Sequence, residues 1–321
     1  MQHFLLSAKS RSLSLKKIYK MGEARAYELF RAIRWPETDG AAVCPKCGCT
    51  ESYDIKSRRK FECKGCKHHY SVTSGTILHS RKLDFTDLLA AICLFVTGSK
   101  GMSAVQFSRT MDVQYKTAWV LCHKMRECLA DETDDVTLSG EVEIDGAYFG
   151  GHIRPANEKA NRIDRRLKKH QTGTRRVVIA LRERYGRTIP FVGRTEAEGV
   201  NIARGIVDKD ATIFADEGSH WDLLDHDYKT GRVNHSTEYS LVNGKHTNWV
   251  ESYFARLRKM IGGQHHWCSA KYLYQYAEHA AWLEDHRSVD IEGLARKIIR
   301  ASILAPKSKK FGGYWQRSVN G

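Results

Sequence analysis

Residues 44–66 read CPKCGCTESYDIKSRRKFECKGC, and this stretch decides the first part of the fold. It holds two C-x2-C pairs, Cys44 with Cys47 and Cys63 with Cys66, separated by fifteen residues. Paired knuckles at this spacing are typical of a four-thiolate zinc site, and four thiolates leave no coordination position open for a substrate. The sequence therefore predicts a structural zinc ion that stands in for a hydrophobic core in this short segment.

The residues around the knuckles predict a zinc ribbon over 41–82. Residues 52–55 and 60–63 alternate like the two strands of a hairpin, with the turn near residues 57–59. Two basic side chains at this turn, Arg58 and Arg59, are expected to contact DNA phosphates.

Two glycines and one further cysteine belong to the same segment. Gly48 follows the first knuckle and Gly65 lies within the second, where a tight turn around a metal is expected to need glycine. Cys49 is expected to stay outside the site, because the two pairs already supply four ligands.

The charge of the chain points to a polyanionic partner. The 321 residues include 52 Lys and Arg against 37 Asp and Glu, a formal charge of +15 with a pI near 9.4. Residues 1–82 alone hold 17 basic and 7 acidic residues, and a second basic run spans 154–176. Two basic runs beside a zinc module favour nucleic acid, here double-stranded DNA. In the second run the expected phosphate contacts are Arg165, Arg166, Lys168 and Lys169.

Several classes of protein are disfavoured by the sequence. The hydrophobic content of 41% suffices for a packed core, and the longest apolar stretch, residues 88–96, is too short to cross a bilayer. Residues 1–17 lack the apolar centre of a signal peptide. The remaining cysteines show no disulfide framework, which favours a reducing, cytoplasmic location.

Helices are predicted on both sides of the ribbon. A helix is expected over 22–33, ending before Pro36, and further helices over 84–130 with a break at 98–101. Residues 103–119 have the rhythm of a helix-turn-helix, with Ser103 in position to cap its first helix. The expected base contacts at the start of the second helix are Gln114, Tyr115 and Lys116. An ordinary helical hairpin is the alternative.

From residue 140 the pattern changes to short β-rich runs. Strands are expected over 141–145, 176–181, 188–192 and 211–216, with a helix over 199–209 before the last of them. This order of three strands, a helix, a strand and then helices predicts an α/β fold with a ribonuclease-H-like mixed sheet.

Acidic residues follow two of these strands. Asp145 and Asp216 each stand at the expected exit of a strand, and the first and fourth strands of such a sheet are adjacent, so both could bind the same pair of divalent cations. A third ligand is expected from the helix that begins near residue 246. Glu251 is favoured because a dication prefers a carboxylate, and Asn248 is its rival three residues earlier. Arg256 and Arg258 on this helix are expected to hold DNA phosphates. Alternatively, Glu251 pairs with a basic neighbour and Asn248 caps the helix.

The motifs together resemble a known family. Residues 30–36, 44–48, 74–76, 116–119, 143–151, 215–216 and 246–251, in this order, are similar to those of the DDE transposases of bacterial insertion sequences, in the ISXO-like group with an N-terminal zinc ribbon. The resemblance implies that Asp145 and Asp216 are catalytic with Mg²⁺ or Mn²⁺, and that the third ligand lies within 246–251, where Asn is frequent in the group. The chain departs from the group after Trp282.

The predicted organisation has five parts: an N-terminal helical segment (1–40), the zinc ribbon (41–82), the helix-turn-helix (83–135), the catalytic domain (136–285) and a C-terminal tail (286–321). The expected function is cleavage and strand transfer at the ends of a DNA element, by a homodimer or larger assembly that joins two ends. One alternative is a non-catalytic DNA-binding regulator derived from a transposase. Another is a nuclease without strand transfer.

Overall fold

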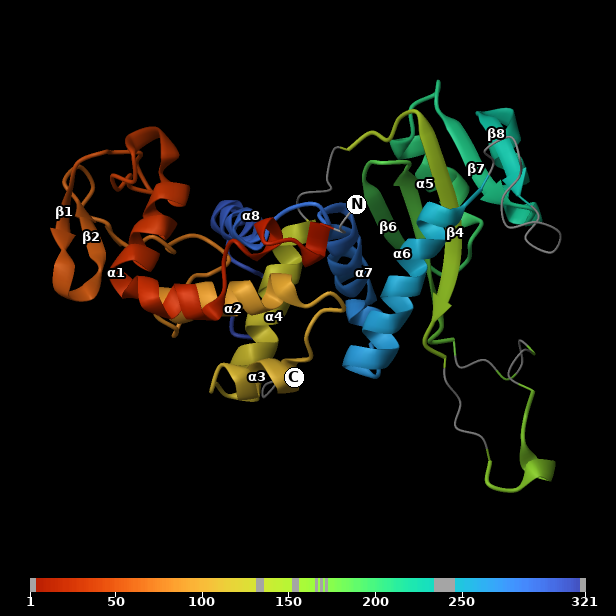
Figure 1. The fold of residues 1–321 in the computed structure, drawn as a ribbon, viewed down its shortest axis with the longest axis horizontal. Coiled ribbons are helices and arrows are strands. Elements are labelled where there is room, and N and C mark those ends of the chain that lie inside the picture. The colour runs from red at the N-terminus through yellow and green to blue at the C-terminus, as the bar shows by residue number, and fades with distance from the viewer. Residues whose placement is uncertain are drawn as a thin grey trace. The chain divides into compact units, whose positions relative to one another are not determined.

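The computed structural model describes residues 4–130, 136–151, 156–164, 167, 170, 173–233 and 246–317. The chain forms two compact units, and the first is built from both ends of the sequence, Met1–Glu132 and His286–Gly321. The second comprises Thr133–Asp285. Figure 1 shows the elements of both. No helix in the described part of the chain has the length and apolar character needed to cross a membrane.

Helices from the two ends of the sequence pack together in the first unit. The long helix α1 bends at Gly22, which has a φ of 75°, so its second half matches the helix predicted over 22–33. Helix α8, from the C-terminal segment, packs on α1, α2 and α4. The bounds are η1 Phe4–Leu6, η2 Lys9–Arg11, α1 Leu15–Arg34, η3 Pro36–Thr38, α2 Phe85–Thr97, α3 Ala104–Thr110, α4 Tyr115–Ala130, α8 Ile291–Leu304 and α9 Tyr314–Arg317.

The zinc-ribbon segment folds as the predicted hairpin with one added strand. The antiparallel order is β1-β2-β3, in which β1 covers Ser52–Ile55, β2 Lys60–Cys63 and β3 His69–Tyr70, with the 3-10 turn η4 at Lys56–Arg58. Trp35 contacts the rings of Phe61 and Tyr70, with centroids 5.7 and 6.4 Å away. This aromatic cluster joins the small sheet to the end of α1.

Helices α3 and α4 are joined by a four-residue connection, residues 111–114. The Ser103 hydroxyl accepts a hydrogen bond from the Gln106 N–H and so caps α3, as predicted. The three residues that were expected to contact bases are exposed: Gln114, Tyr115 and Lys116.

The second unit is a five-stranded mixed sheet with helices on both faces. Its order, β6-β5-β4-β7-β8, places the first predicted strand beside the fourth, consistent with a ribonuclease-H-like domain. The edge strand β8 was not predicted. The bounds are β4 Glu141–Phe149, η5 Lys159–Asn161, β5 Arg176–Glu183, β6 Thr188–Gly193, α5 Glu198–Ile206, β7 Thr212–Asp216, η7 Ser219–His226, β8 Lys229–Val233, α6 Asn248–Lys259, the π-helical turn η8 Met260–His265 and α7 Ala270–Asp285.

The two faces of this sheet have separate cores. Val142 and Ile144 of β4 pack with α5 and with Trp221 of η7. Ala147 packs with α6 and α7 on the opposite face, and Phe149 lies against the same cluster. Because side chains alternate along a strand, residues 143, 145, 147 and 149 of β4 all face α6 and α7.

Candidate functional site

The four cysteines of the knuckles meet at one point. Sγ of Cys44 lies 3.6 Å from Sγ of Cys66, Sγ of Cys47 lies 3.5 Å from Sγ of Cys63, and all four sulfurs are within 4.8 Å of one another. Zinc bound tetrahedrally at the usual Zn–S length would hold its sulfurs about 3.8 Å apart. The cluster therefore has the spacing that a zinc ion requires, and Cys49 is outside it, as predicted.

The two knuckles turn in the same way with different residues. Gly48 has a φ of 73°, and its N–H donates to the carbonyl of Cys44. In the second knuckle, the N–H of Lys67 donates the matching hydrogen bond to the carbonyl of Cys63, and Lys67 has a φ of 56°. The expectation that Gly65 supplies this conformation is therefore wrong. The left-handed residue comes directly after each C-x2-C pair, not within it.

Asp145 and Asp216 occupy matching positions on neighbouring parallel strands. The pairing of β4 with β7 runs from Glu141 opposite Thr212 to Glu143 opposite Phe214, and the same register would put Asp145 opposite Asp216. Pairing stops two residues before that point, so both aspartates lie where the strands separate. Asp145 lies within β4 and not at its exit, because β4 continues to pair with β5 as far as Phe149.

The environment of Asp145 shifts the pKa of its carboxyl group. Burial, together with the nearby charges of Asp216, Glu196 and Glu251, raises the pKa of Asp145 to about 7, although the N–H of Gly146 donates to its Oδ1 at 2.7 Å. Carboxylates are the hard oxygen donors that Mg²⁺ and Mn²⁺ prefer, and a dication would relieve their repulsion. Among the described residues, however, only the four cysteines have ligand atoms close enough together to hold an ion, so the acids match such a metal in chemistry but lie further apart than a bound ion would hold them.

The two rivals for the third ligand differ in their surroundings. Glu251 is half-buried, accepts a hydrogen bond at 3.0 Å from the hydroxyl of Thr247, and is one of the charges that act on Asp145. Asn248 is the exposed first residue of α6, and the N-cap position belongs to Thr247. The prediction that Asn248 caps the helix is therefore wrong.

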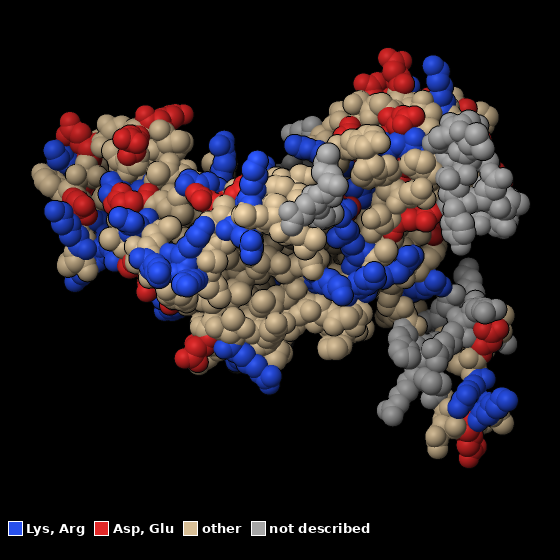
Figure 2. Space-filling view, viewed as in Figure 1, with Lys and Arg blue, Asp and Glu red and all other residues tan. Residues whose placement is uncertain are grey.

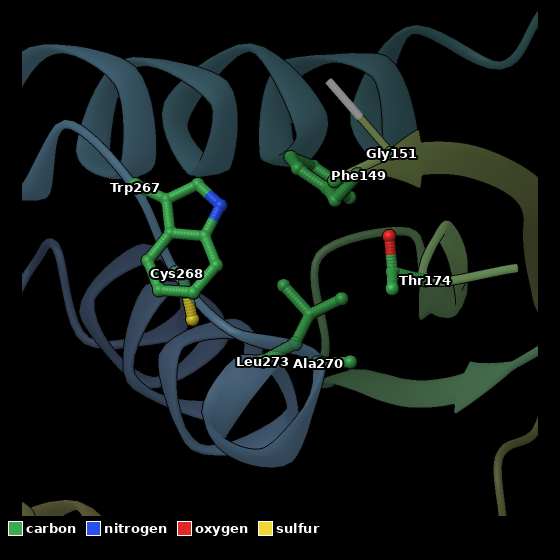
Figure 3. A pocket seen from close by; sticks show the side chains of 8 residues that line it. Phe149, Gly151, Thr174, Trp267, Cys268, Ala270 and Leu273 are labelled. Carbon is green, nitrogen blue, oxygen red and sulfur yellow. The ribbon is translucent and has the colours of Figure 1, made fainter. Parts of the chain in front are cut away.

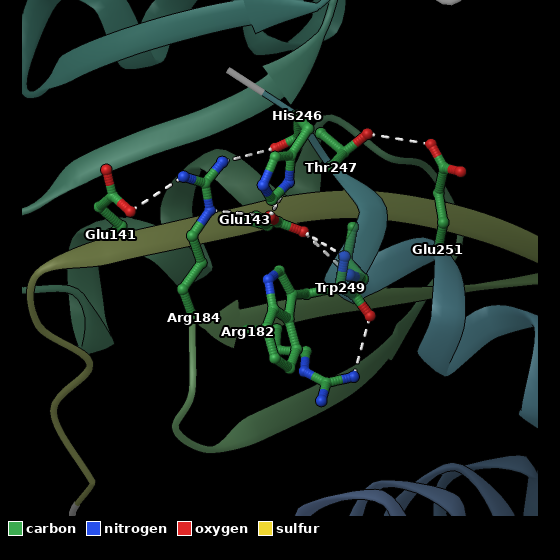
Figure 4. Close-up of polar contacts among 9 residues, drawn as sticks. Glu141, Glu143, Arg182, Arg184, His246, Thr247, Trp249 and Glu251 are labelled. Carbon is green, nitrogen blue, oxygen red and sulfur yellow. Dashed lines mark hydrogen bonds and ion pairs between the residues drawn. The ribbon is translucent and has the colours of Figure 1, made fainter. Parts of the chain in front are cut away.

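A buried ionic network fixes the start of α6 to β4 (Figure 4). Glu143 is fully buried, and its Oε2 accepts the N–H groups of Trp249 and Val250 at 2.8 and 3.0 Å. Its Oε1 lies 3.0 Å from Nε of Arg184 and 3.0 Å from Nδ1 of His246. A carboxylate at a helix N-terminus satisfies free N–H groups and complements the helix dipole. Glu143 therefore sets the position of the helix that carries Glu251.

Arg184 and Arg182, neighbours on the β5 side, complete this network. Arg184 also donates to the carbonyl of His246 and pairs with Glu141, both at 2.9 Å. Arg182 donates to the carbonyl of Trp249 at 2.9 Å. Sequence reasoning missed this network. The available signal was Glu143 itself, a charged residue inside an otherwise apolar strand, two positions before Asp145.

Glu196 and His220 were also missed. They form an ion pair at 3.4 Å, and Glu196 lies over Gly146 so closely that a Cβ there would come within 2.4 Å of its Cγ. Burial raises the pKa of Glu196, with Asp216 adding to the effect and His220 opposing it. The glycine beside Asp145 thus makes room for a fourth acidic side chain, which comes from the loop after β6 and had no sequence pattern to mark it.

Lys and Arg side chains are exposed on both units (Figure 2). The residues predicted to contact DNA phosphates are either exposed, paired with an acidic side chain, or outside the described part of the chain. Arg58 and Arg258 are exposed. Arg59 is instead paired with Glu23 and lies over the ring of Tyr27, while Arg256 is paired with the buried Glu284. Four others lie outside the described residues: Arg165, Arg166, Lys168 and Lys169.

The C-terminal segment contacts the predicted recognition helix. The rings of Tyr314 and Trp315 lie 4.8 and 5.8 Å from that of Trp119 on α4. Nζ of Lys116 lies 5.2 Å from the centre of the Trp315 ring. The aromatic residues of the tail thus pack within the first unit, beside residues that were expected to meet DNA.

Comparison with known proteins agrees with the sequence motifs. Residues 137–285 match the model of the ISXO2-like transposase domain, and residues 21–69 match that of the transposase zinc-ribbon domain. No curated protein and no solved structure matches the chain. The matched segments contain the four clustered cysteines, both aspartates and helix α6. The chain therefore carries an ISXO2-like transposase domain preceded by a transposase zinc-ribbon domain.

Proposed function

We propose that the protein is a DDE-type DNA transposase that cuts at the ends of its element and transfers the cut strands to target DNA. The observation that carries this proposal is the shared register of Asp145 and Asp216, with Glu251 acting on the same carboxylate. Three separate segments, in the order aspartate, aspartate, glutamate, would thereby contribute to one metal site. A regulator that only binds DNA would have no need of such a costly arrangement.

The acidic residues would act as metal ligands. Asp145, Asp216 and Glu251 would hold Mg²⁺ or Mn²⁺, which would supply activation of the attacking oxygen and stabilisation of the leaving one. Glu143 and Arg184 would keep α6, and therefore Glu251, in place. Arg258, seven residues after Glu251 and exposed, would contact a phosphate near the cleaved bond.

The first unit would supply DNA binding. The zinc ribbon, with Arg58 exposed at its hairpin tip, and the α3–α4 pair, read as a helix-turn-helix, would hold the terminal repeats of the element. Gln114, Tyr115 and Lys116 would meet base edges. Joining two ends requires two catalytic sites, so we propose a homodimer or larger assembly on DNA in the cytoplasm.

The decisive test uses the DNA that flanks the gene, whose inverted repeats would supply labelled substrates. Asp145→Asn and Asp216→Asn should each lower the cleavage rate by on the order of a thousandfold while end binding persists, since each removes one ligand charge. Binding without Mg²⁺-dependent cleavage by the wild-type chain would favour the regulator. Cleavage without joined products would favour the nuclease.

A further inference from the structure

A small hollow lies beyond the end of β4, within the second unit (Figure 3). It is shallow and open to solvent, and its enclosed space is well below the range for sites that bury a whole drug-sized ligand. Its walls are mostly apolar, and the ring of Trp267 on one side remains 68% exposed. The lining residues are Phe149, Gly150, Gly151, Thr174, Trp267, Cys268, Ala270 and Leu273. A large aromatic ring left open to solvent beside an apolar hollow is suited to stacking with a flat ligand.

Strand β4 connects this hollow to the acidic cluster. Phe149 lies four residues after Asp145, and the two side chains face the same side of the sheet. Four residues of strand span about 13 Å. Because one strand of B-form DNA advances about 3.4 Å per nucleotide, only a few nucleotides separate the two places.

The exposed side of α6 provides a path between them. Asn248, Ala255, Arg258 and Lys259 are exposed, at spacings that place them along one side of the helix with the half-buried Glu251. The helix then runs through η8 into the loop that bears Trp267. A nucleic-acid strand that leaves the acids along this side would pass two cations before it reaches the indole.

A further cation lies near the hollow. The side chain of Arg175 lies against Gly151, where an added Cβ would come within 3.0 Å of its Cβ. Its guanidinium lies 4.1 Å from the centre of the Tyr148 ring, and both side chains are exposed. Because side chains alternate along β4, this pair lies on the face of the sheet opposite to Phe149 and is not part of the wall of the hollow.

We propose that this hollow receives one unpaired base of the DNA strand a few nucleotides from the cleaved phosphate, with the base stacked on Trp267. The proposal rests on the proposed transposase function and adds a base site that the acidic cluster does not supply. The base must be unpaired, because its edge would otherwise be occupied by its partner and its face by its neighbours. Arg258 and Lys259 would hold phosphates of the strand between the acids and this base.

The test measures affinity for two labelled DNAs by fluorescence anisotropy, with no Mg²⁺ added so that nothing is cut. One is a short blunt duplex of mixed sequence, and the other is the same duplex with a single-stranded overhang. The wild-type chain should prefer the overhang by roughly fivefold or more, as expected for one stacked base. Trp267→Ala should abolish this preference and leave the blunt affinity unchanged, whereas Trp267→Phe should retain most of it.

Tyr185 offers a matched control. It is 89% exposed, belongs to the same unit, and follows β5 at the end of the sheet near Glu141, away from the hollow. Tyr185→Ala should leave the preference intact. The base site is refuted by an unchanged preference in Trp267→Ala, an equal loss in Tyr185→Ala, or no preference in a wild-type chain that binds and cuts duplex DNA. A wild-type chain that binds no duplex at all overturns the proposed function as well.

Discussion

The zinc site and the acidic site both gather ligands of like charge, but they draw them from very different lengths of chain. All four zinc ligands lie within residues 44–66, on a hairpin with little core of its own. The proposed acidic ligands extend from Asp145 to Glu251 and belong to two strands and a helix of a sheet unit with two packed faces. The first site is therefore expected to need its metal in order to fold, whereas the second is held together by the protein.

Loss of one zinc ligand is the largest effect we expect. Cys63→Ser should release the zinc and unfold the ribbon, because binding of structural zinc is worth about 10–16 kcal/mol in small zinc-finger peptides. Zinc content and duplex affinity of the full chain should both fall, while omission of Mg²⁺ from the buffer should leave the sheet unit folded. Cys49→Ser is the control and should keep its zinc. A Cys63→Ser chain with stoichiometric zinc would contradict the assignment.

The buried network around Glu143 tests whether the protein itself holds the acidic site together, in contrast to the zinc site. Glu143→Gln removes the charge that Arg184 and His246 face, and breaking a buried pair typically costs about 3–5 kcal/mol of unfolding free energy. Glu141 pairs with the same arginine but its side chain is 54% exposed, so Glu141→Gln should cost less than about 1 kcal/mol.

Chemical denaturation of both variants measures this difference. Rates at saturating DNA then show whether Glu143 also positions Glu251: Glu143→Gln should lower the cleavage rate while duplex affinity stays near wild type. Equal stability losses in the two variants would show that the acidic site is not held by this network.

The smallest effect that we expect is the one that distinguishes Glu251 from Asn248 as the third metal ligand. Glu251→Gln should slow Mg²⁺-dependent cleavage by on the order of a hundredfold, with partial recovery in the more tolerant Mn²⁺, because an amide has no charge to offer a dication. Asn248→Ala changes an exposed side chain at the start of α6 and should cost little in rate or stability. If instead the Asn248 variant is inactive and the Glu251 variant cuts normally, Asn248 is the ligand.

The same contrast explains what could be predicted from sequence. The hairpin and its four cysteines follow from local spacing, and the strand order follows from hydrophobic runs, so the ribbon and the adjacency of β4 and β7 were predicted correctly. Glu143, Arg184 and Glu196 were missed because their partners are far away in sequence and no periodic pattern links them. Arg59 was misread for a related reason: Glu23, which pairs with it, lies 36 residues earlier, in helix α1.

The first unit is completed by the C-terminal segment of the chain, and this affects the order in which the two units can fold during translation. Helix α8 packs on α1, α2 and α4 but is made only after the whole sheet unit. During translation the segment Thr133–Asp285 can therefore fold while its N-terminal neighbour still lacks a helix. A shortened product that stops before residue 291 would carry every proposed metal ligand, and would still have an incompletely packed first unit.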